Sequence, residues 1–203
     1  MVVVGIDLAG VETRPSGFCT LDPETLKVET KILYGDEEII REVEVSGAEV
    51  VAIDAPLSIP KGRKSLSERS NIHLRECDRE LLRLGIRFFP ITLGPMRKLT
   101  ERGIRLKEKL ERRGFKVIEV YPGGAQDILG IPRKGRGLEK LLEGLRKLGL
   151  KGLRGDMTGD ELDAVTSAYV GKLYIEGEYT ALGDADEGVM IMPKVRKDYT
   201  LRE

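Results

Sequence analysis

Three apolar runs in this sequence each carry a carboxylate at or near their end. Asp7 closes VVVGID, Asp54 closes VVAID, and Glu119 lies within KVIEV. The runs have the length and the Val and Ile content of buried strands. Parallel strands present their carboxyl ends along one edge of a sheet, which is where ligands bind in open α/β folds. We therefore predict that these strands are parallel neighbours and that their three acids line one crevice.

A fourth segment, TGDELDAVTSAYVGK, supplies two further acids. Asp160 and Asp163 are three residues apart, so they lie on one face of a helix predicted over 160–175. The same face continues through four small residues: Ala164, Ser167, Ala168 and Gly171. A face of small side chains lets the helix backbone approach a sheet closely, and this helix would bring both carboxylates with it.

The gathering of these acids predicts a particular chemistry. Carboxylates in a partly buried crevice repel one another, so either some become protonated or a cation binds among them. Oxygen ligands without His or Cys favour Mg²⁺ or Mn²⁺. Ions held in this way usually activate a water and stabilise a leaving oxygen in phosphoryl chemistry. The acids therefore predict metal-dependent hydrolysis of phosphodiester bonds.

Each acid also has a structural interpretation. An Asp that ends a strand is often a turn former or a helix cap, and Asp160 is suited to the first turn of its helix. Glu119 could form an ion pair with an Arg of the segment 97–113. The catalytic interpretation is favoured by the conjunction, because independent caps need not follow three apolar runs and a helix with a small-residue face.

The elements that position these acids follow from hydrophobic periodicity and turn residues. Strands are expected at 2–8, 15–22, 26–34, 49–54 and 116–120, and helices at 36–47, 73–85, 96–114, 125–130, 138–149 and 160–175. A three-strand meander followed by strand–helix units predicts an α/β fold with a mixed five-stranded sheet flanked by helices. We expect one domain over 1–203, with a helical insertion at about 60–114 and a C-terminal hairpin at 179–193.

Composition limits the classes of protein to consider. The chain of 203 residues is 40% hydrophobic and 33% charged, as in globular proteins, and its 34 basic and 34 acidic residues balance. A strongly basic nucleic-acid-binding protein is therefore not indicated. Basic clusters at 61–64, 133–136 and 194–197 could still contact phosphates, or they could be solvated surface.

Cysteine content and segment lengths indicate a compartment. Cys19 and Cys77 are too few for a disulfide scaffold, which predicts a reducing, cytoplasmic setting. No segment has the pattern of a signal peptide or the length of a membrane span, so we expect no membrane association. The abundance of Lys, Arg and Glu is typical of a thermophile source.

Five ordered segments resemble one known family. GIDLAG, AIDAPLSIP, RECDRELLRLGI, VIEVYPGGAQDILG and GDELDAVTSAY together resemble the family catalogued as domain of unknown function 429, DUF429. Its members are described as predicted nucleases with a ribonuclease H-like fold, and the resemblance spans roughly residues 2–193. That fold has an Asp on its first strand, an acid ending its fourth strand, and a final helix with one or two Asp. The Asp160-x-x-Asp163 arrangement is similar to that of the Holliday-junction resolvases of this superfamily.

The resemblance implies roles for the acids. Carried over by position, Asp7 would bridge two metal ions, and Asp54 and Asp163 would each hold one of them. Asp160 would be a further ligand or an acid beside the ligands. Glu119 belongs to a family motif, and we count it as a candidate catalytic residue without an assigned role. The resolvases commonly have Glu where this chain has Asp54, which leaves the ligand geometry at that position open.

The expected function is that of a nuclease that uses Mg²⁺ or Mn²⁺ and has nucleic acid as its partner. Two alternatives stay open. One is a non-catalytic nucleic-acid-binding or scaffold module that keeps the fold. The other is an ATP-binding relative of the actin-like kinases, although those proteins normally place ATP between two such domains. The oligomeric state is open as well, and the hairpin near 178–193 could form the edge of a homodimer.

Overall fold

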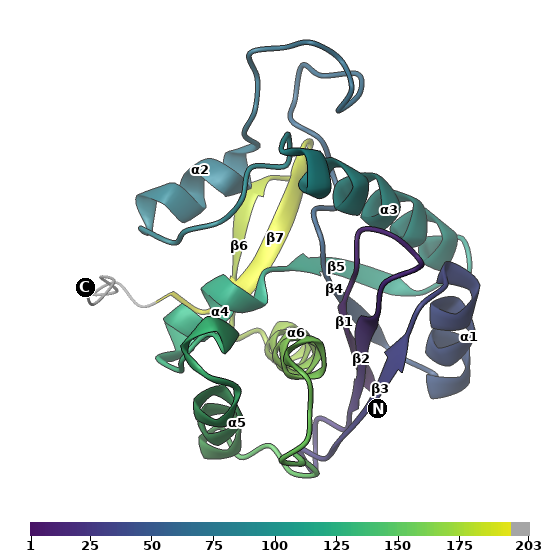
Figure 1. The fold of residues 1–203 in the computed structure, drawn as a ribbon, viewed down its shortest axis with the longest axis vertical. Coiled ribbons are helices and arrows are strands. Elements are labelled where there is room, and N and C mark those ends of the chain that lie inside the picture. The colour runs from purple at the N-terminus through teal and green to yellow at the C-terminus, as the bar shows by residue number, and fades with distance from the viewer. Residues whose placement is uncertain (196–203) are drawn as a thin grey trace.

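A mixed sheet of seven strands forms the centre of the computed structural model, which describes residues 1–195 (Figure 1). The strands are β1 (Val3–Asp7), β2 (Ser16–Leu21), β3 (Val28–Leu33), β4 (Val50–Asp54), β5 (Lys116–Val120), β6 (Tyr179–Asp184) and β7 (Gly188–Pro193). Their order across the sheet is β3-β2-β1-β4-β5-β7-β6. β1, β2 and β3 form the antiparallel meander, and β1, β4 and β5 run parallel. The prediction for these five strands is confirmed.

The C-terminal hairpin extends this sheet. β7 pairs in parallel with β5, joining Met190 to Glu119 and Ile191 to Val120, and β6 completes the edge. Met190, Ile191 and Met192 are buried, because the pairing places them in the core beside β5. The sheet therefore has seven strands, whereas five strands and a separate hairpin were predicted.

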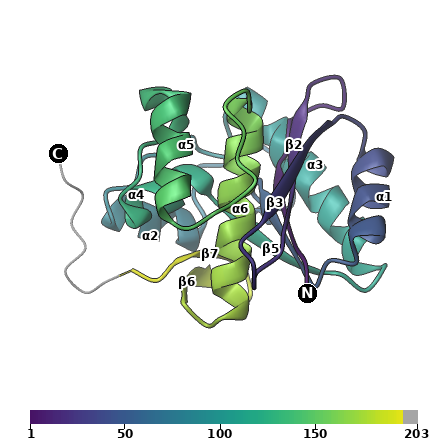
Figure 2. The ribbon, with the colours of Figure 1, turned by 90° about the horizontal axis from the view of Figure 1, so that it is seen from below.

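Helices cover both faces of the sheet. They are α1 (Asp36–Ser46), α2 (Glu76–Arg83), α3 (Gly94–Glu111), α4 (Pro122–Leu129), α5 (Leu138–Lys147) and α6 (Gly159–Ile175), with a 3₁₀ turn at Lys134–Arg136. Figure 2 shows the strands between α6 on one side and α1 and α3 on the other. Because both faces are covered, β1 and β4 are apolar along nearly their whole length. Within residues 1–195, none of the helices combines the length and the apolar character that a membrane crossing needs.

α6 lies very close to the sheet because a glycine on each side of the contact leaves room for the residues opposite it. A Cβ added at Gly5 of β1 would lie 2.1 Å from the carbonyl oxygen of Ala164. On the helix side, a Cβ added at Gly171 would lie 2.6 Å from Cγ1 of Val3. The prediction that small residues bring this helix close to the sheet is confirmed.

The chain between β4 and α3 leaves the sheet and packs α2 against the β6–β7 hairpin. The carboxylate of Glu187, at the hairpin turn, accepts hydrogen bonds from the backbone N–H groups of Lys61 and Glu76 at 2.6 and 2.5 Å. Glu80 of α2 accepts one from the backbone N–H of Gly183 at 2.8 Å. These bonds hold the segment between β4 and α3, residues 55–93, on the part of the sheet that the hairpin adds.

Candidate metal centre

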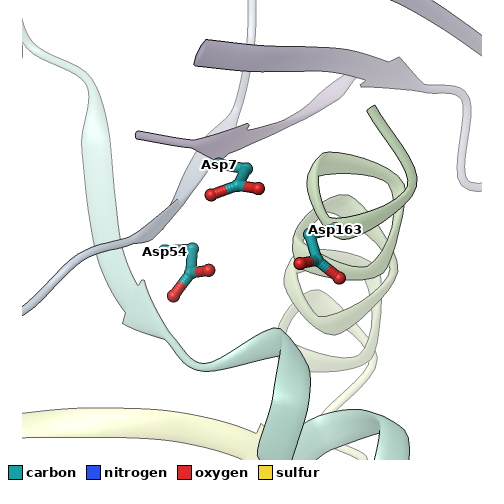
Figure 3. Close-up of side chains that lie close together, drawn as sticks. All are labelled: Asp7, Asp54 and Asp163. Carbon is teal, nitrogen blue, oxygen red and sulfur yellow. The ribbon is translucent and has the colours of Figure 1, made fainter. Parts of the chain in front are cut away.

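Three aspartates meet at the carboxyl ends of the central strands. Asp7 and Asp54 end adjacent parallel strands and are paired in register, so their side chains leave the sheet on the same face. Asp163 reaches this place from α6, which covers that face. One carboxylate oxygen from each of the three lies within 4.8 Å of the other two. Figure 3 shows the three side chains around one space.

The position of Asp163 depends on where α6 begins. Thr158 caps the helix: its hydroxyl accepts from the backbone N–H of Glu161 at 3.2 Å, and the Glu161 carboxylate accepts from the backbone N–H of Thr158 at 2.8 Å. Gly17, the register partner of Asp7, lies against the first turn. A Cβ added there would be 2.0 Å from the carbonyl oxygen of Asp160. The cap and the glycine together place the start of α6 beside Asp7.

A glutamine on α4 orients the Asp163 carboxylate. Nε2 of Gln126 donates to Oδ1 of Asp163 at 2.7 Å and lies 3.1 Å from the hydroxyl of Thr166. Gln126 and Asp163 are both buried. Since this amide occupies Oδ1, the other oxygen, Oδ2, is the one that Asp163 can offer to a cation.

Lys134 directs its ammonium group into the acid cluster. Its Nζ lies 2.7 Å from Oδ2 of Asp163, 3.4 Å from Oδ2 of Asp7 and 3.6 Å from Oδ1 of Asp160. Asp160 is 41% exposed, so it lies at the rim of the cluster rather than among the three closely spaced acids. The structure thus brings four of the five candidate acids to one region, with three of them in close contact.

Burial shapes the protonation of the strand acids. Burial raises the pKa of Asp7 from 3.8 to about 7, and repulsion from Asp163 and Asp160 adds to this, against the opposing charge of Lys134. Burial and then the charge of Asp7 raise the pKa of Asp54 well above its usual value. Among residues 1–195, no protein group donates a hydrogen bond to the Asp54 carboxylate, which is half-buried and therefore still open to solvent or to an ion.

These residues fit a hard divalent ion. All three close ligand groups are carboxylates, and oxygen ligands suit Mg²⁺ and Mn²⁺. Burial and mutual repulsion disfavour the charged forms of Asp7 and Asp54 and raise their pKa values, and a bound cation would oppose both effects. Asp54, which has no donor within the described residues, is the acid whose charge a cation would satisfy most directly.

Glu119 does not lie with the other acids. It is paired in register with Ile53, one position before Asp54, and therefore leaves the opposite face of the sheet. Its Oε2 accepts from the backbone N–H of Leu57 at 2.7 Å and from Arg75 at 2.8 Å. The prediction that all three strand acids line one crevice thus holds for the two aspartates and is wrong for Glu119. The alternative of an ion pair with an arginine is correct in kind, but the arginine is Arg75, at the start of α2, and not one within 97–113.

Several members of the predicted basic clusters are engaged within the protein. Arg63 is buried and donates to backbone carbonyl oxygens of its own loop. Arg133 and Lys194 form ion pairs with nearby acids. Arg196 and Lys197 lie outside the described residues. Phosphate binding by these groups stays a prediction.

Sequence reasoning missed two residues of the site, Gln126 and Lys134. Each lay within a segment that had been singled out, Gln126 in the motif VIEVYPGGAQDILG and Lys134 in the basic cluster at 133–136. Neither segment has a periodicity that shows which side chain points toward the acids.

Comparisons with known proteins agree with this architecture. A family model described as "Protein of unknown function (DUF429)" matches residues 5–187. A solved structure of RuvC from Thermus thermophilus is similar to this chain with a TM-score of 0.50 and 16% sequence identity, covering 87% of this chain and 97% of that chain. The search of curated proteins found no match. At this identity the likeness concerns the fold, which is ribonuclease H-like. The family model covers most of the sequence, and the chain therefore belongs to the DUF429 family.

Proposed function

We propose that this protein is a nuclease that hydrolyses phosphodiester bonds with Mg²⁺ or Mn²⁺ held by Asp7, Asp54 and Asp163. The observation that carries the proposal is the approach of these three carboxylates to within 4.8 Å, with Asp54 lacking a donor among the described residues. The ribonuclease H-like fold shared with RuvC supports a nucleic-acid substrate. A bound divalent ion would supply activation of a water and stabilisation of the leaving oxygen.

The chain's own residues prepare the site for that ion. Gln126 holds Asp163 in one orientation, and the close packing of α6 on β1 keeps Asp163 beside Asp7. Such support around metal ligands commonly raises metal affinity by roughly 10- to 100-fold. Asp160, at the exposed rim of the cluster, is the acid placed nearest to an approaching substrate. No catalytic role is proposed for Glu119, because it lies on the other face of the sheet, where its Oε2 accepts hydrogen bonds from Arg75 and from the backbone of Leu57.

Cleavage assays test this function. Purified protein is incubated with single-stranded, duplex, hybrid and branched substrates in Mg²⁺, in Mn²⁺ and in EDTA. Asp7→Asn and Asp163→Asn are expected to lower the rate at least about 100-fold, since each removes a ligand charge. Asp186→Asn is the matched control, because that aspartate is 85% exposed at the hairpin turn. The proposal is refuted if the two site variants cleave as fast as the parent.

A second candidate function rests on Lys134. An ammonium group 2.7 Å from Asp163 is also what a purely structural acid cluster would contain. In that case the protein would be a non-catalytic nucleic-acid-binding or scaffold module. Crystals soaked in Mn²⁺ distinguish the two candidates, because anomalous density among Asp7, Asp54 and Asp163 is expected only from a metal centre.

A further inference from the structure

We propose that Lys134 is an internal counterion which a divalent ion must displace, so that this lysine sets the metal affinity of the centre. The inference rests on the proposed metal centre and concerns its regulation. The Nζ of Lys134 contacts two of the three ligand carboxylates, at 2.7 Å from Asp163 and 3.4 Å from Asp7. Two cations that share these carboxylates repel each other strongly at such distances. Occupancy by the ammonium and occupancy by the metal therefore exclude each other.

The backbone next to Lys134 is fixed, which makes its position a built feature of the site. Arg133 donates to Oδ1 of Asp127 at 3.0 Å and to Oδ2 at 2.5 Å. It also donates to the hydroxyl of Tyr121 at 3.0 Å and to the carbonyl oxygen of Arg87 at 3.2 Å. Its guanidinium lies 5.5 Å from the centre of the Tyr121 ring. These contacts hold residue 133 between α4 and the loop before α3, and the next side chain is directed into the acids.

The start of α6 leaves room for the lysine side chain. A Cβ added at Gly159 would lie 3.2 Å from Cδ of Lys134. A larger residue at position 159 would therefore press against the lysine stem. Arg133 fixes the chain before Lys134, and Gly159 leaves space for the lysine stem. Both features favour the inward position of the ammonium.

The Lys134 side chain also has an alternative position, at the exposed rim beside Asp160. The lysine side chain is 45% exposed, so it can swing outward without movement of the anchored backbone. Asp160 lies 3.6 Å from Nζ at the exposed rim and offers the ammonium a partner there. In the displaced position the positive charge would stand at the mouth of the centre, where a substrate phosphate would approach.

Calorimetric titration with Mn²⁺ tests the inference on the full-length protein. Lys134→Met removes the charge and keeps an unbranched stem, and we expect it to bind Mn²⁺ at least tenfold more tightly than the parent. Lys134→Arg keeps the charge and should not gain affinity. Lys61→Met is the control, because the Lys61 ammonium lies 3.8 and 3.9 Å from two hairpin acids, Asp184 and Asp186, rather than in the metal centre. Equal Mn²⁺ affinity in the parent and in Lys134→Met would overturn the inference while leaving the metal centre intact. No Mn²⁺ binding by either protein would instead remove the metal centre and the inference together.

A chemical measurement on the unaltered protein gives a second readout. Reductive methylation of lysines is followed by mass spectrometry with and without Mg²⁺. An ammonium held by carboxylates reacts slowly, so Lys134 should be methylated several-fold faster when Mg²⁺ has displaced it. An unchanged or slower rate for Lys134 with Mg²⁺ contradicts displacement.

Discussion

At the scale of single residues, the acids of the centre differ in what opposes their charge. Asp163 has a donor on each oxygen, Gln126 on one and Lys134 on the other. Asp54, within the described residues, receives no hydrogen bond at all. Keeping an ionised carboxylate buried without a partner costs free energy. We therefore expect the free energy of unfolding of the metal-free protein to fall at high pH, where these groups ionise.

Exchange of Asp7 for Asn is expected to stabilise the metal-free protein at high pH. Because the folded pKa of Asp7 is about 7 against a usual 3.8, the folded protein keeps a proton that the unfolded chain has already lost. The stability contributed by this group is full below the unfolded value and is lost as pH rises through the folded one. Urea unfolding in EDTA at about pH 8 should show Asp7→Asn more stable than the parent by about 1–3 kcal/mol.

The same comparison at low pH supplies its own control. At about pH 3, below the usual value of 3.8, the carboxyl group is largely protonated in both states of the parent, so the two proteins should unfold at similar urea concentrations. Asp186→Asn should match the parent at both pH values, since this side chain is exposed. If Asp7→Asn is the less stable protein at high pH, the attraction between Asp7 and Lys134 outweighs the burial of Asp7.

The sequence allowed us to predict which aspartates lie together, but not on which face of the sheet each strand acid lies. Asp7, Asp54 and Asp163 could be located because strand ends and helical spacing fix their places in a parallel arrangement. Glu119 shows the limit. The register partner of Asp54 is Val120, and because side chains alternate along a strand, an offset of one residue sends Glu119 to the other face. Nothing in KVIEV encodes that register.

At the scale of elements, the centre depends on the short distance between α6 and the sheet. Gly5→Ala is expected to lower the free energy of unfolding by about 3 kcal/mol or more, because the added methyl meets backbone atoms of Ala164 and Ala168 that cannot move separately from the helix. Any folded fraction should bind Mn²⁺ more weakly, since α6 carries Asp163. Urea unfolding and calorimetry measure the two effects.

Gly155→Ala is the matched control for that exchange. A Cβ added at Gly155 meets no atom within 4 Å, so stability should change by less than about 0.5 kcal/mol. Equal stability of Gly5→Ala and Gly155→Ala would show that the close approach of α6 is not required.

Element type was easier to predict from sequence than element pairing. The helical spacing of the acids and small residues located α6, and turn residues located the hairpin. The pairing of β7 with β5 joins segments about 70 residues apart in the chain. Local sequence patterns do not show which of such distant strands will pair. Gln126 and Lys134 were missed for the same reason, since their positions follow from how the chain after β5 turns back toward α6.

At the scale of the whole molecule, a buried ion-pair network connects the segment between β4 and α3, residues 55–93, to the sheet. Arg75 is 1% exposed and contacts Glu119 of β5 at 2.8 Å and Asp78 of α2 at 3.0 Å. Removal of one partner leaves a buried charge without compensation. Residues 55–93 and the sheet are therefore expected to unfold together.

Arg75→Met is expected to lower the free energy of unfolding by about 3–5 kcal/mol. Adding Glu119→Gln should recover part of that loss, because the uncompensated charge is removed, and urea unfolding of the single and double variants measures it. Arg79→Met is the control on the same helix, where an exposed pair with Glu76 is worth less than about 1 kcal/mol. A double variant as unstable as Arg75→Met alone would contradict this account.

The hairpin has a further consequence for how the molecule behaves in a crowded solution. β7 pairs with one side of β5, and without it that side would present unpaired N–H and C=O groups on a strand whose Val and Ile side chains are buried in the complete fold. An open border of this kind is a template on which a strand from another molecule can grow. β7 covers this border and β6 becomes the outer edge in its place, so cleavage that removes residues from Tyr179 onward is expected to expose β5 and to promote association between molecules.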